Sequence, residues 1–311
     1  MSVSTGAARR RRGTEVVGSG AGSGRNNLAG ILLMVAAMAL VPMIDVLAKY
    51  LVTDGIPALQ VVYLRMLCGT IILFPFMLSA RRREIVPPQG WTRALLLGVF
   101  GIASGVCFFG ALRYLSIADT LALSFVQPLF VTILSRLFLA ERVSPLRWLA
   151  LFVGFGATLL IIRPGMGAIN TGTILALCSG ASMACYVILV KHGTSGRTRV
   201  SALTLTYQSH SMAFLVATPL MFWLWQDLTH PQWVMAVCLT AIGLVGQYLI
   251  IKAYDFGETS LIAPLAYTEI ITSTAASWQF FGQTPDNITL IGVAILVFSS
   301  VLLARNSGAK V

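Results

Sequence analysis

Two carboxyl groups lie inside long apolar stretches of the chain, where an ionisable side chain is costly. Glu269 stands near the middle of the apolar run 259–281, and Asp45 lies within the run 28–52. Insertion scales put the cost of a charged side chain at the centre of a membrane helix at about 2.5–3.5 kcal/mol, so such residues usually mark a function. A carboxyl that takes up and releases a proton at that depth would serve as a coupling site. Helix packing is the structural alternative.

Polar and aromatic side chains near Glu269, or equivalent to it, are candidate ligand contacts. Gln127 lies 142 positions before Glu269 and precedes a proline, which lacks a backbone N–H and opens a helix locally. Tyr267 and Trp278 are close to Glu269 in sequence, and Tyr186 lies in another apolar run. Aromatic faces bind flat rings and organic cations. The sequence predicts a binding site built from these five residues, with plain packing as the alternative for each aromatic side chain.

A second group of ionisable residues lies in the first two apolar runs. Asp45 and Lys49 are four residues apart, so they share one helix face and can pair. Arg65 enters the next run at a similar depth. The three would form either a closed ion-pair cluster, or a gate or clamp for a ligand carboxylate. His210 and Gln208 are candidates for a proton relay, whereas a hydrogen bond to a neighbouring helix is the alternative for His210.

Hydrophobicity predicts the elements that position these residues. The chain has 311 residues, of which 57% are hydrophobic and 11% charged, against about 45–50% and about 25% in soluble domains. A helix needs about 20 mostly apolar residues to cross the hydrocarbon core. The sequence therefore predicts an all-α polytopic membrane protein and excludes a soluble or a disordered chain. Its ten transmembrane helices are expected at 28–52, 57–79, 91–113, 117–139, 146–163, 170–191, 201–225, 232–254, 259–281 and 287–304.

Basic residues predict the orientation of these spans. With the N-terminus in the cytoplasm, only Lys49, Arg113 and Arg163 lie on outer flanks and Arg65 lies inside a span, whereas the other Lys and Arg residues lie on inner flanks. Such an excess marks the cytoplasmic side. We expect a multi-pass protein of the cell inner membrane with both termini cytoplasmic, and a disordered basic tail over 1–26. This distribution accounts for the net charge of +11 without nucleic acid as a partner.

A weak internal repeat divides the chain into two halves. Residues 111–141, offset by 142, fall on 253–283, and the order of helices, turns and loops agrees. Each half holds five spans, and because five is odd the halves must face opposite ways across the bilayer. We therefore predict two inverted five-helix repeats, at 28–163 and 170–305. Inverted repeats are typical of transporters, with the substrate site near the midplane between them.

Three stretches carry a family resemblance: MIDVLAKYL (43–51) with LRM (64–66), ALRYLSIADTLALSFVQPLF with AE (111–141), and APLAYTEI with FGQTPD (263–286). On these stretches the chain resembles the drug/metabolite transporter superfamily, EamA type. The last stretch is similar to the subgroup that includes bacterial S-adenosylmethionine uptake proteins and riboflavin transporters. Gln283 stands where family members usually have an acid, and we expect it to affect packing at the outer surface rather than the substrate.

The resemblance implies a secondary-active transporter of a small organic metabolite, with alternating access and protons as the candidate coupling ion. S-adenosylmethionine, riboflavin and an amino-acid-like compound stay open as substrates, as do the direction of transport and a homodimer. A membrane-embedded transferase acting on a lipid-like substrate is the alternative. Such an enzyme needs acidic metal ligands or several His residues, and the chain has three His. We expect no catalytic residue, metal or cofactor, because the cysteines stand alone and no GxxxxGK[ST] phosphate loop occurs.

Overall fold

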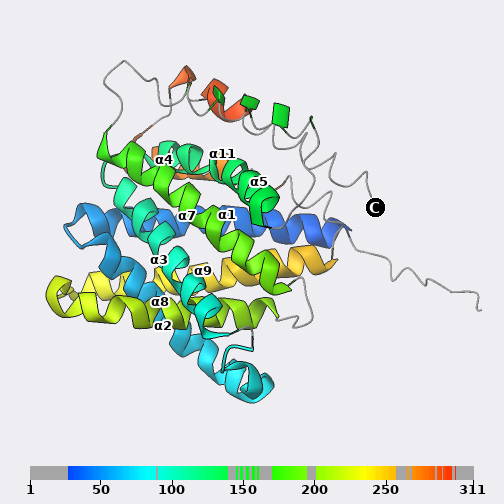
Figure 1. Ribbon diagram of the computed structural model, residues 1–311. Helices are drawn as coiled ribbons and strands as arrows, with labels where there is room; N and C mark the ends of the chain where they lie inside the picture. Colours follow the sequence, from blue (N-terminus) through cyan, green and yellow to red (C-terminus); the bar gives the residue numbers. More distant parts are fainter. Residues whose placement is uncertain are drawn as a thin grey trace, which may run out of the picture.

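The computed structural model describes residues 27–88, 90–138, 170–194, 201–256 and 268–283, with shorter pieces between 145 and 160, at 265 and between 286 and 298. The predicted tail 1–26 lies outside the described residues, as do most of the run 146–163 and the end of the run 287–304. All elements of the described part are helices (Figure 1): α1 (Asn27–Thr53), α2 (Ala58–Ala80), η1 (Arg82–Glu84), α3 (Trp91–Ala111), α4 (Ile117–Ser124), α5 (Gln127–Phe138), α7 (Thr171–Thr194), α8 (Ala202–Leu224), α9 (His230–Phe256) and α11 (Thr268–Phe281).

The prediction of an all-α, multi-pass membrane protein is confirmed. In the described part of the chain, six stretches are long and apolar enough to cross a bilayer: Leu28–Thr53, Ala58–Ser79, Trp91–Ala111, Ile117–Phe138, Thr171–Val190 and His230–Ala253. The ends of α1, α2, α3, α7, α8 and α9 agree closely with the predicted runs. The count of ten spans stays a prediction, since parts of the chain lie outside the described residues.

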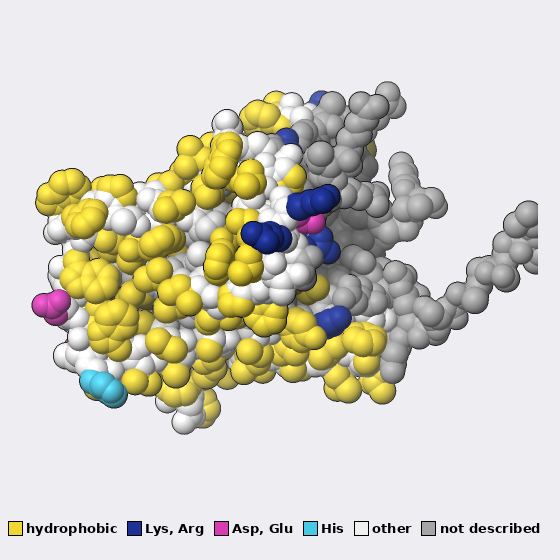
Figure 2. All heavy atoms as spheres, turned by 90° about the horizontal axis from the view of Figure 1, so that it is seen from below, with side chains coloured by type: hydrophobic (Ala, Val, Ile, Leu, Met, Phe, Trp, Pro, Cys, Tyr) yellow, Lys and Arg dark blue, Asp and Glu magenta, His cyan; other side chains and the backbone are white. Residues whose placement is uncertain are grey.

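The surface of the bundle is apolar, and polar groups lie inside it. Phe222 and Trp223 at the end of α8 are 82% and 81% exposed, whereas Gln60 and Gln208 are completely or almost completely buried. Hydrophobic side chains cover most of the face shown in Figure 2, and Lys and Arg side chains gather toward one end of it. This distribution suits a lipid environment, in which the outside of a helix bundle is as apolar as its core.

The helix contacts between the two halves of the chain come in pairs, which are related by exchanging equivalent helices. The most extensive contacts join α1 to α9 and α3 to α7. Likewise α3 packs on α8 as α2 packs on α9, and α5 packs on α7 as α1 packs on α11, while α2 and α8 pack on each other. Exchanging α1 with α7, α2 with α8, α3 with α9 and α5 with α11 converts each of the first six contacts into another of the six and leaves the α2–α8 contact unchanged. The two halves are therefore interlocked, and Figure 1 shows α1 and α9 running side by side.

The predicted span 117–139 is interrupted by a turn at Phe125 and Val126, which separates α4 from α5. The proline that follows Gln127 has no N–H to donate to the carbonyl of Ser124, so the helix opens there. This carbonyl comes so close to α7 that a Cβ at Gly180 would lie 2.6 Å from it and 2.8 Å from a methyl group of Val126. The absence of a side chain at Gly180 therefore permits the break to pack against α7.

Candidate functional site

Ionisable side chains from five helices meet inside the bundle. The carboxyl of Asp45 in α1 interacts electrostatically with Arg65 in α2 and with Glu269 in α11. The guanidinium of Arg65 also interacts with Tyr186 in α7 and with His210 in α8. We call these five residues the central cluster. The structure thus brings together predicted residues that are distant in sequence and belong to both halves of the chain.

The charged side chains of the central cluster are near one another but not in direct contact. Among the described residues, no hydrogen bond joins the side chains of Asp45, Arg65 and Glu269 to another group. They also form no ion pair with an N–O distance below 4.0 Å there; the described pair, Arg81–Glu84 at 2.7 Å, lies outside the cluster. Asp45 is only 6% exposed. A guanidinium has five N–H donors, and a buried charge without a partner is destabilising. Within the described part of the chain, the side chains of Asp45, Arg65 and Glu269 therefore lie in the bundle without a direct polar partner.

Two further helices form walls of the central cluster. A Cβ at Gly243 of α9 would lie 3.5 Å from Nη2 of Arg65, so the guanidinium packs on the backbone of α9. Gly101 of α3 is close to both Ser209 and Tyr186, since a Cβ there would lie 3.2 Å from the Ser209 hydroxyl and 3.7 Å from the Tyr186 ring. Tyr186 also interacts with Ser209. The hydroxyl of Ser209 is therefore an additional polar group beside the cluster, which the sequence analysis did not single out.

His210 and Gln208 do not form the predicted relay pair. Two residues apart on α8, they point to different sides of the helix. Nδ1 of His210 lies 2.8 Å from the carbonyl oxygen of Thr206, and its ring lies against α2, where a Cβ at Gly69 would be 2.5 Å from it. Gln208 instead donates from Nε2 to the carbonyl oxygen of Glu84 at 3.2 Å. The structure places His210 in the central cluster and Gln208 outside it.

Lys49 does not form the predicted ion pair with Asp45. Its ammonium donates to the carbonyl oxygen of Leu115 and to Oε1 of Gln283, both at 2.8 Å, and lies 4.9 Å from the centre of the Phe281 ring. We call Lys49, Leu115, Phe281 and Gln283 the Lys49 junction. It ties the end of α1 to the segment after α3 and to the end of α11. Two neutral oxygens and an aromatic ring are thus its direct contacts in place of the carboxylate of Asp45, and the carboxylate of Asp119 lies in electrostatic range. Gln283 does more than pack at the surface.

Of the remaining predicted contacts of Glu269, Trp278 does not share its side of α11. Glu269 lies in the first turn of α11, and Gln127 is the first residue of α5, so the two half-helices begin at nearly equivalent positions of the repeat. Trp278 is nine residues after Glu269, which places it on the opposite side of α11, and it is 62% exposed. Tyr267 lies outside the described residues. The structure therefore turns Trp278 away from the central cluster.

The beginning of α8 carries a run of buried polar residues that the sequence analysis treated only in part. Thr204, Thr206, Ser209 and Ser211 are all at most 8% exposed. The amide of Gln247 in α9 donates to Thr206 Oγ1 at 2.8 Å, and Thr204 donates a short hydrogen bond to the carboxylate of Glu84. The stretch TLTYQSHS (204–211) inside an otherwise apolar helix was the available signal for these contacts.

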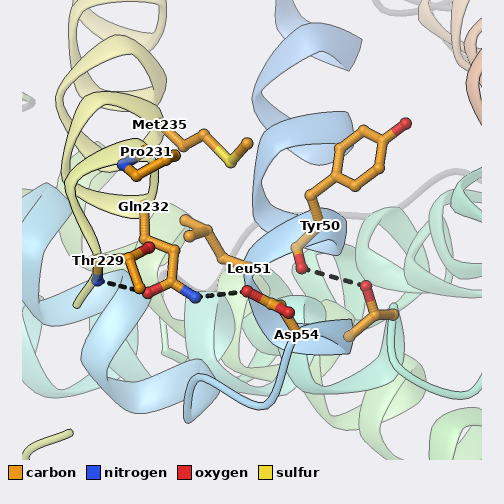
Figure 3. Close-up of a pocket in the computed structure, with 8 residues that line it drawn as sticks. Tyr50, Leu51, Asp54, Thr229, Pro231, Gln232 and Met235 are labelled. Atoms are coloured by element: carbon orange, nitrogen blue, oxygen red, sulfur yellow. Dashed lines mark hydrogen bonds between the residues drawn. The ribbon is translucent and has the colours of Figure 1, made fainter. Parts of the chain in front are cut away.

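A cavity of about 410 Å³ lies at the junction between the end of α1 and the beginning of α9. Figure 3 shows the residues that line it, among them Tyr50, Asp54 and Met235. The carboxylate of Asp54 accepts a short hydrogen bond from the amide of Gln232, whose oxygen accepts from the backbone N–H of Thr229 at 2.8 Å. The acid of this cavity is therefore already hydrogen-bonded within the protein. In the described part of the chain, no group of three or more His, Cys, Asp or Glu side chains could hold a metal ion.

The sequence matches the EamA-like transporter family twice, over residues 28–163 and 170–305. Among similar proteins, the pseudopaline exporter CntI of Pseudomonas aeruginosa is 28% identical, with 89% of this chain and 96% of that protein covered. A riboflavin transporter of Vibrio cholerae is 27% identical, with 89% and 93% covered. An S-adenosylmethionine uptake transporter of Rickettsia prowazekii is 23% identical, with 89% and 92% covered.

A solved crystal structure of a protein has the same fold. It superposes with a TM-score of 0.56 at 16% sequence identity, over 87% of this chain and 98% of the other. At this identity the similarity concerns the arrangement of the helices and not the ligand.

Proposed function

This chain belongs to the EamA-like transporter family, and we propose that it is a secondary-active transporter which moves a small organic metabolite across the inner membrane by alternating access. The observation that carries the proposal is the central cluster, in which ionisable residues from both halves of the chain meet inside an apolar bundle. A polar site between two repeats is where such a transporter binds its substrate. The names of the relatives favour transport over catalysis.

The proposed architecture is ten spans, arranged as two inverted five-helix repeats with both termini in the cytoplasm. The exchange of helix contacts between the two halves supports it. So do the starts of α5 at Gln127 and of α11 at Thr268, which are separated by nearly the same offset as the sequence repeat. The excess of Lys and Arg on the predicted inner flanks supports the orientation.

The relatives suggest the range of substrates. Their names include pseudopaline, riboflavin and S-adenosylmethionine, so we propose a substrate of this size and polarity, with amino-acid-like compounds included. Glu269 is the proposed proton-coupling residue, because its carboxyl lies in the first turn of α11 and in electrostatic range of Asp45. The positive end of a helix dipole stabilises the charged form of a carboxyl at this position.

Transport by the purified protein in proteoliposomes tests this function. We expect uptake of radiolabelled S-adenosylmethionine, riboflavin or an amino acid above that of empty liposomes, and accumulation when a pH gradient is imposed. Glu269→Gln should retain exchange of substrate but lose pH-driven accumulation, because the amide resembles the protonated acid and cannot release a proton. The exposed Trp278→Ala is the matched control on the same helix. Absence of uptake for the whole panel contradicts transport, and normal accumulation by Glu269→Gln contradicts the coupling role.

A further inference from the structure

The cavity of about 410 Å³ between the end of α1 and the beginning of α9 lies at the outer end of the bundle in the proposed orientation, and we call it the outer cavity. Its rim is exposed at Asp54 and Thr229. Its floor is buried, since Leu51 is 1% and Gln232 8% exposed. The volume is within the range of about 300–1,000 Å³ that is typical of sites for small molecules. In the described part of the chain, its lining includes no residue of the central cluster.

The charge of the outer cavity is that of one carboxylate, from Asp54. Gln232 reaches across from α9 and donates the short hydrogen bond to Oδ2 of this carboxylate (Figure 3), whereas Oδ1 accepts no hydrogen bond among the described residues. No Lys, Arg or His of the described part comes within 4.0 Å of it. A carboxylate has about four lone-pair sites. Asp54 can therefore accept further hydrogen bonds from a ligand.

The end of α1 is a second feature that favours a cation in the outer cavity. This helix ends at Thr53, directly before Asp54, and has no basic residue in its last turn. The carbonyl groups at the C-terminal end of a helix carry about half a negative charge. They repel the neighbouring carboxylate, and a bound cation relieves this repulsion.

The remaining lining indicates what kind of cation fits. Leu51, Pro231 and Met235 provide apolar surface, and Figure 3 shows the side chain of Met235 extending from α9 toward α1. A metal ion needs several oxygen, nitrogen or sulfur ligands, and the described residues contain no group of three or more His, Cys, Asp or Glu that could hold one. An organic cation with a short carbon chain uses both the carboxylate and the apolar walls.

We propose that the outer cavity binds the ammonium group of a small organic amine, with an N–H donated to Oδ1 of Asp54 and the carbon chain beside Leu51 and Met235. An ammonium has three N–H donors and no acceptor, so it complements the free acceptor of Asp54. The site is separate from the central cluster, and the inference therefore goes beyond the proposed transport function.

The amine has two sources at this depth of the membrane. Trp225 and Trp233 lie close to the outer cavity in sequence, their rings are 6.2 Å apart, and they are 40% and 41% exposed. Exposed Trp side chains are typical of the level of the lipid headgroups. The ammonium can therefore belong to a soluble amine or to the ethanolamine headgroup of a phospholipid.

Matched amines and alcohols test the proposal. The full-length protein is placed in nanodiscs of phosphatidylglycerol and phosphatidylcholine, whose headgroups have no ammonium N–H. It is titrated with ethylamine, butylamine and phenethylamine, each compared with the alcohol of the same carbon skeleton. Saturation-transfer NMR gives the apparent dissociation constants, and protein-free nanodiscs correct for adsorption to the lipid. We expect at least one amine to bind about fivefold or more tightly than its alcohol, which corresponds to about 1 kcal/mol at an exposed carboxylate.

Variants assign the parts of the amine to residues. Asp54→Asn should remove the advantage of the amine over the alcohol, and its amide oxygen can still accept from Gln232, so the link between α1 and α9 is kept. Met235→Ala should weaken butylamine and phenethylamine more than ethylamine. Asp227→Asn is the matched control, because it removes an exposed acid of the α8–α9 connection that does not line the outer cavity. It should leave the advantage unchanged.

Replacing phosphatidylcholine by phosphatidylethanolamine at the same ratio separates the two sources without changing the membrane charge. Weaker binding of butylamine in these nanodiscs, with no such difference for Asp54→Asn, assigns the site to the lipid headgroup. Equal binding in both nanodiscs assigns it to soluble amines.

Three results overturn the ammonium site: equal binding of every amine and its alcohol, an advantage that survives Asp54→Asn, or an equal loss in Asp54→Asn and Asp227→Asn. Transport in proteoliposomes decides the proposed function separately. Amine binding without transport contradicts the transporter and not this site, whereas transport without amine binding contradicts only this site.

Discussion

The Lys49 junction gives a sharp test of the packing described above. The ammonium of Lys49 is almost fully buried, and Gln283 supplies one of its two hydrogen-bond acceptors at 2.8 Å. Gln283→Leu removes this acceptor and leaves the cation with the Leu115 carbonyl, the Phe281 ring and the more distant carboxylate of Asp119. A hydrogen bond to a charged group contributes about 1.5–3 kcal/mol. Because the side chain of Gln283 is exposed and water can take its place, we expect a loss near the lower end of this range.

The same substitution should have little effect once the charge is absent. Lys49→Met replaces the buried cation by an apolar side chain of similar length, so no donor then depends on Gln283. We therefore expect the free energy of unfolding to fall by about 1.5 kcal/mol for Gln283→Leu alone and by about zero in the Lys49→Met background. Titration of the purified protein with denaturing detergent, followed by tryptophan fluorescence, measures both values.

A matched control uses Gln226, which contacts Gln60 only through its backbone N–H and carbonyl, at 3.0 and 2.6 Å. Gln226→Leu should give the same small change with and without Lys49→Met. An equal loss for Gln283→Leu in both backgrounds, with a coupling energy below about 0.5 kcal/mol, would show that Lys49 does not depend on Gln283 and would refute the description of the junction.

Two further predictions concern packing and orientation. Gly180→Val should lower the free energy of unfolding by about 1–3 kcal/mol, because a Cβ there would lie 2.6 Å from the carbonyl oxygen of Ser124. The control is Gly246→Ala, whose Cβ would make an ordinary 3.4 Å contact. It should not be destabilising in the same unfolding assay. In a cysteine-free background, Asp227→Cys should react with a membrane-impermeant maleimide in intact cells, whereas Arg83→Cys should react only after lysis, because the two residues lie near opposite ends of α8. Labelling of Arg83→Cys from outside would contradict cytoplasmic termini.

The positions of the helices follow from the sequence because they depend on local composition. A bilayer requires every backbone polar group to be satisfied within the segment, so an apolar run of sufficient length becomes a helix whatever its neighbours are. This is why the predicted run 28–52 appears as α1 (Asn27–Thr53) and the run 232–254 as α9 (His230–Phe256). The opening of the helix beside Gln127 was also predictable, because the proline that follows is a local cause.

The neighbours of each site residue were decided by tertiary structure. The acceptors of Lys49 are 66 and 234 positions away in the chain, whereas Asp45, four positions away, is not its partner. A helix that faces lipid on one side and apolar neighbours on the other has little periodicity to reveal its rotation. Rotation alone separates Trp278 from Glu269 on α11 and Gln208 from His210 on α8. The sequence determined which ionisable residues lie within apolar runs, and only the packing of the helices decided that Asp45 lies in electrostatic range of both Arg65 and Glu269.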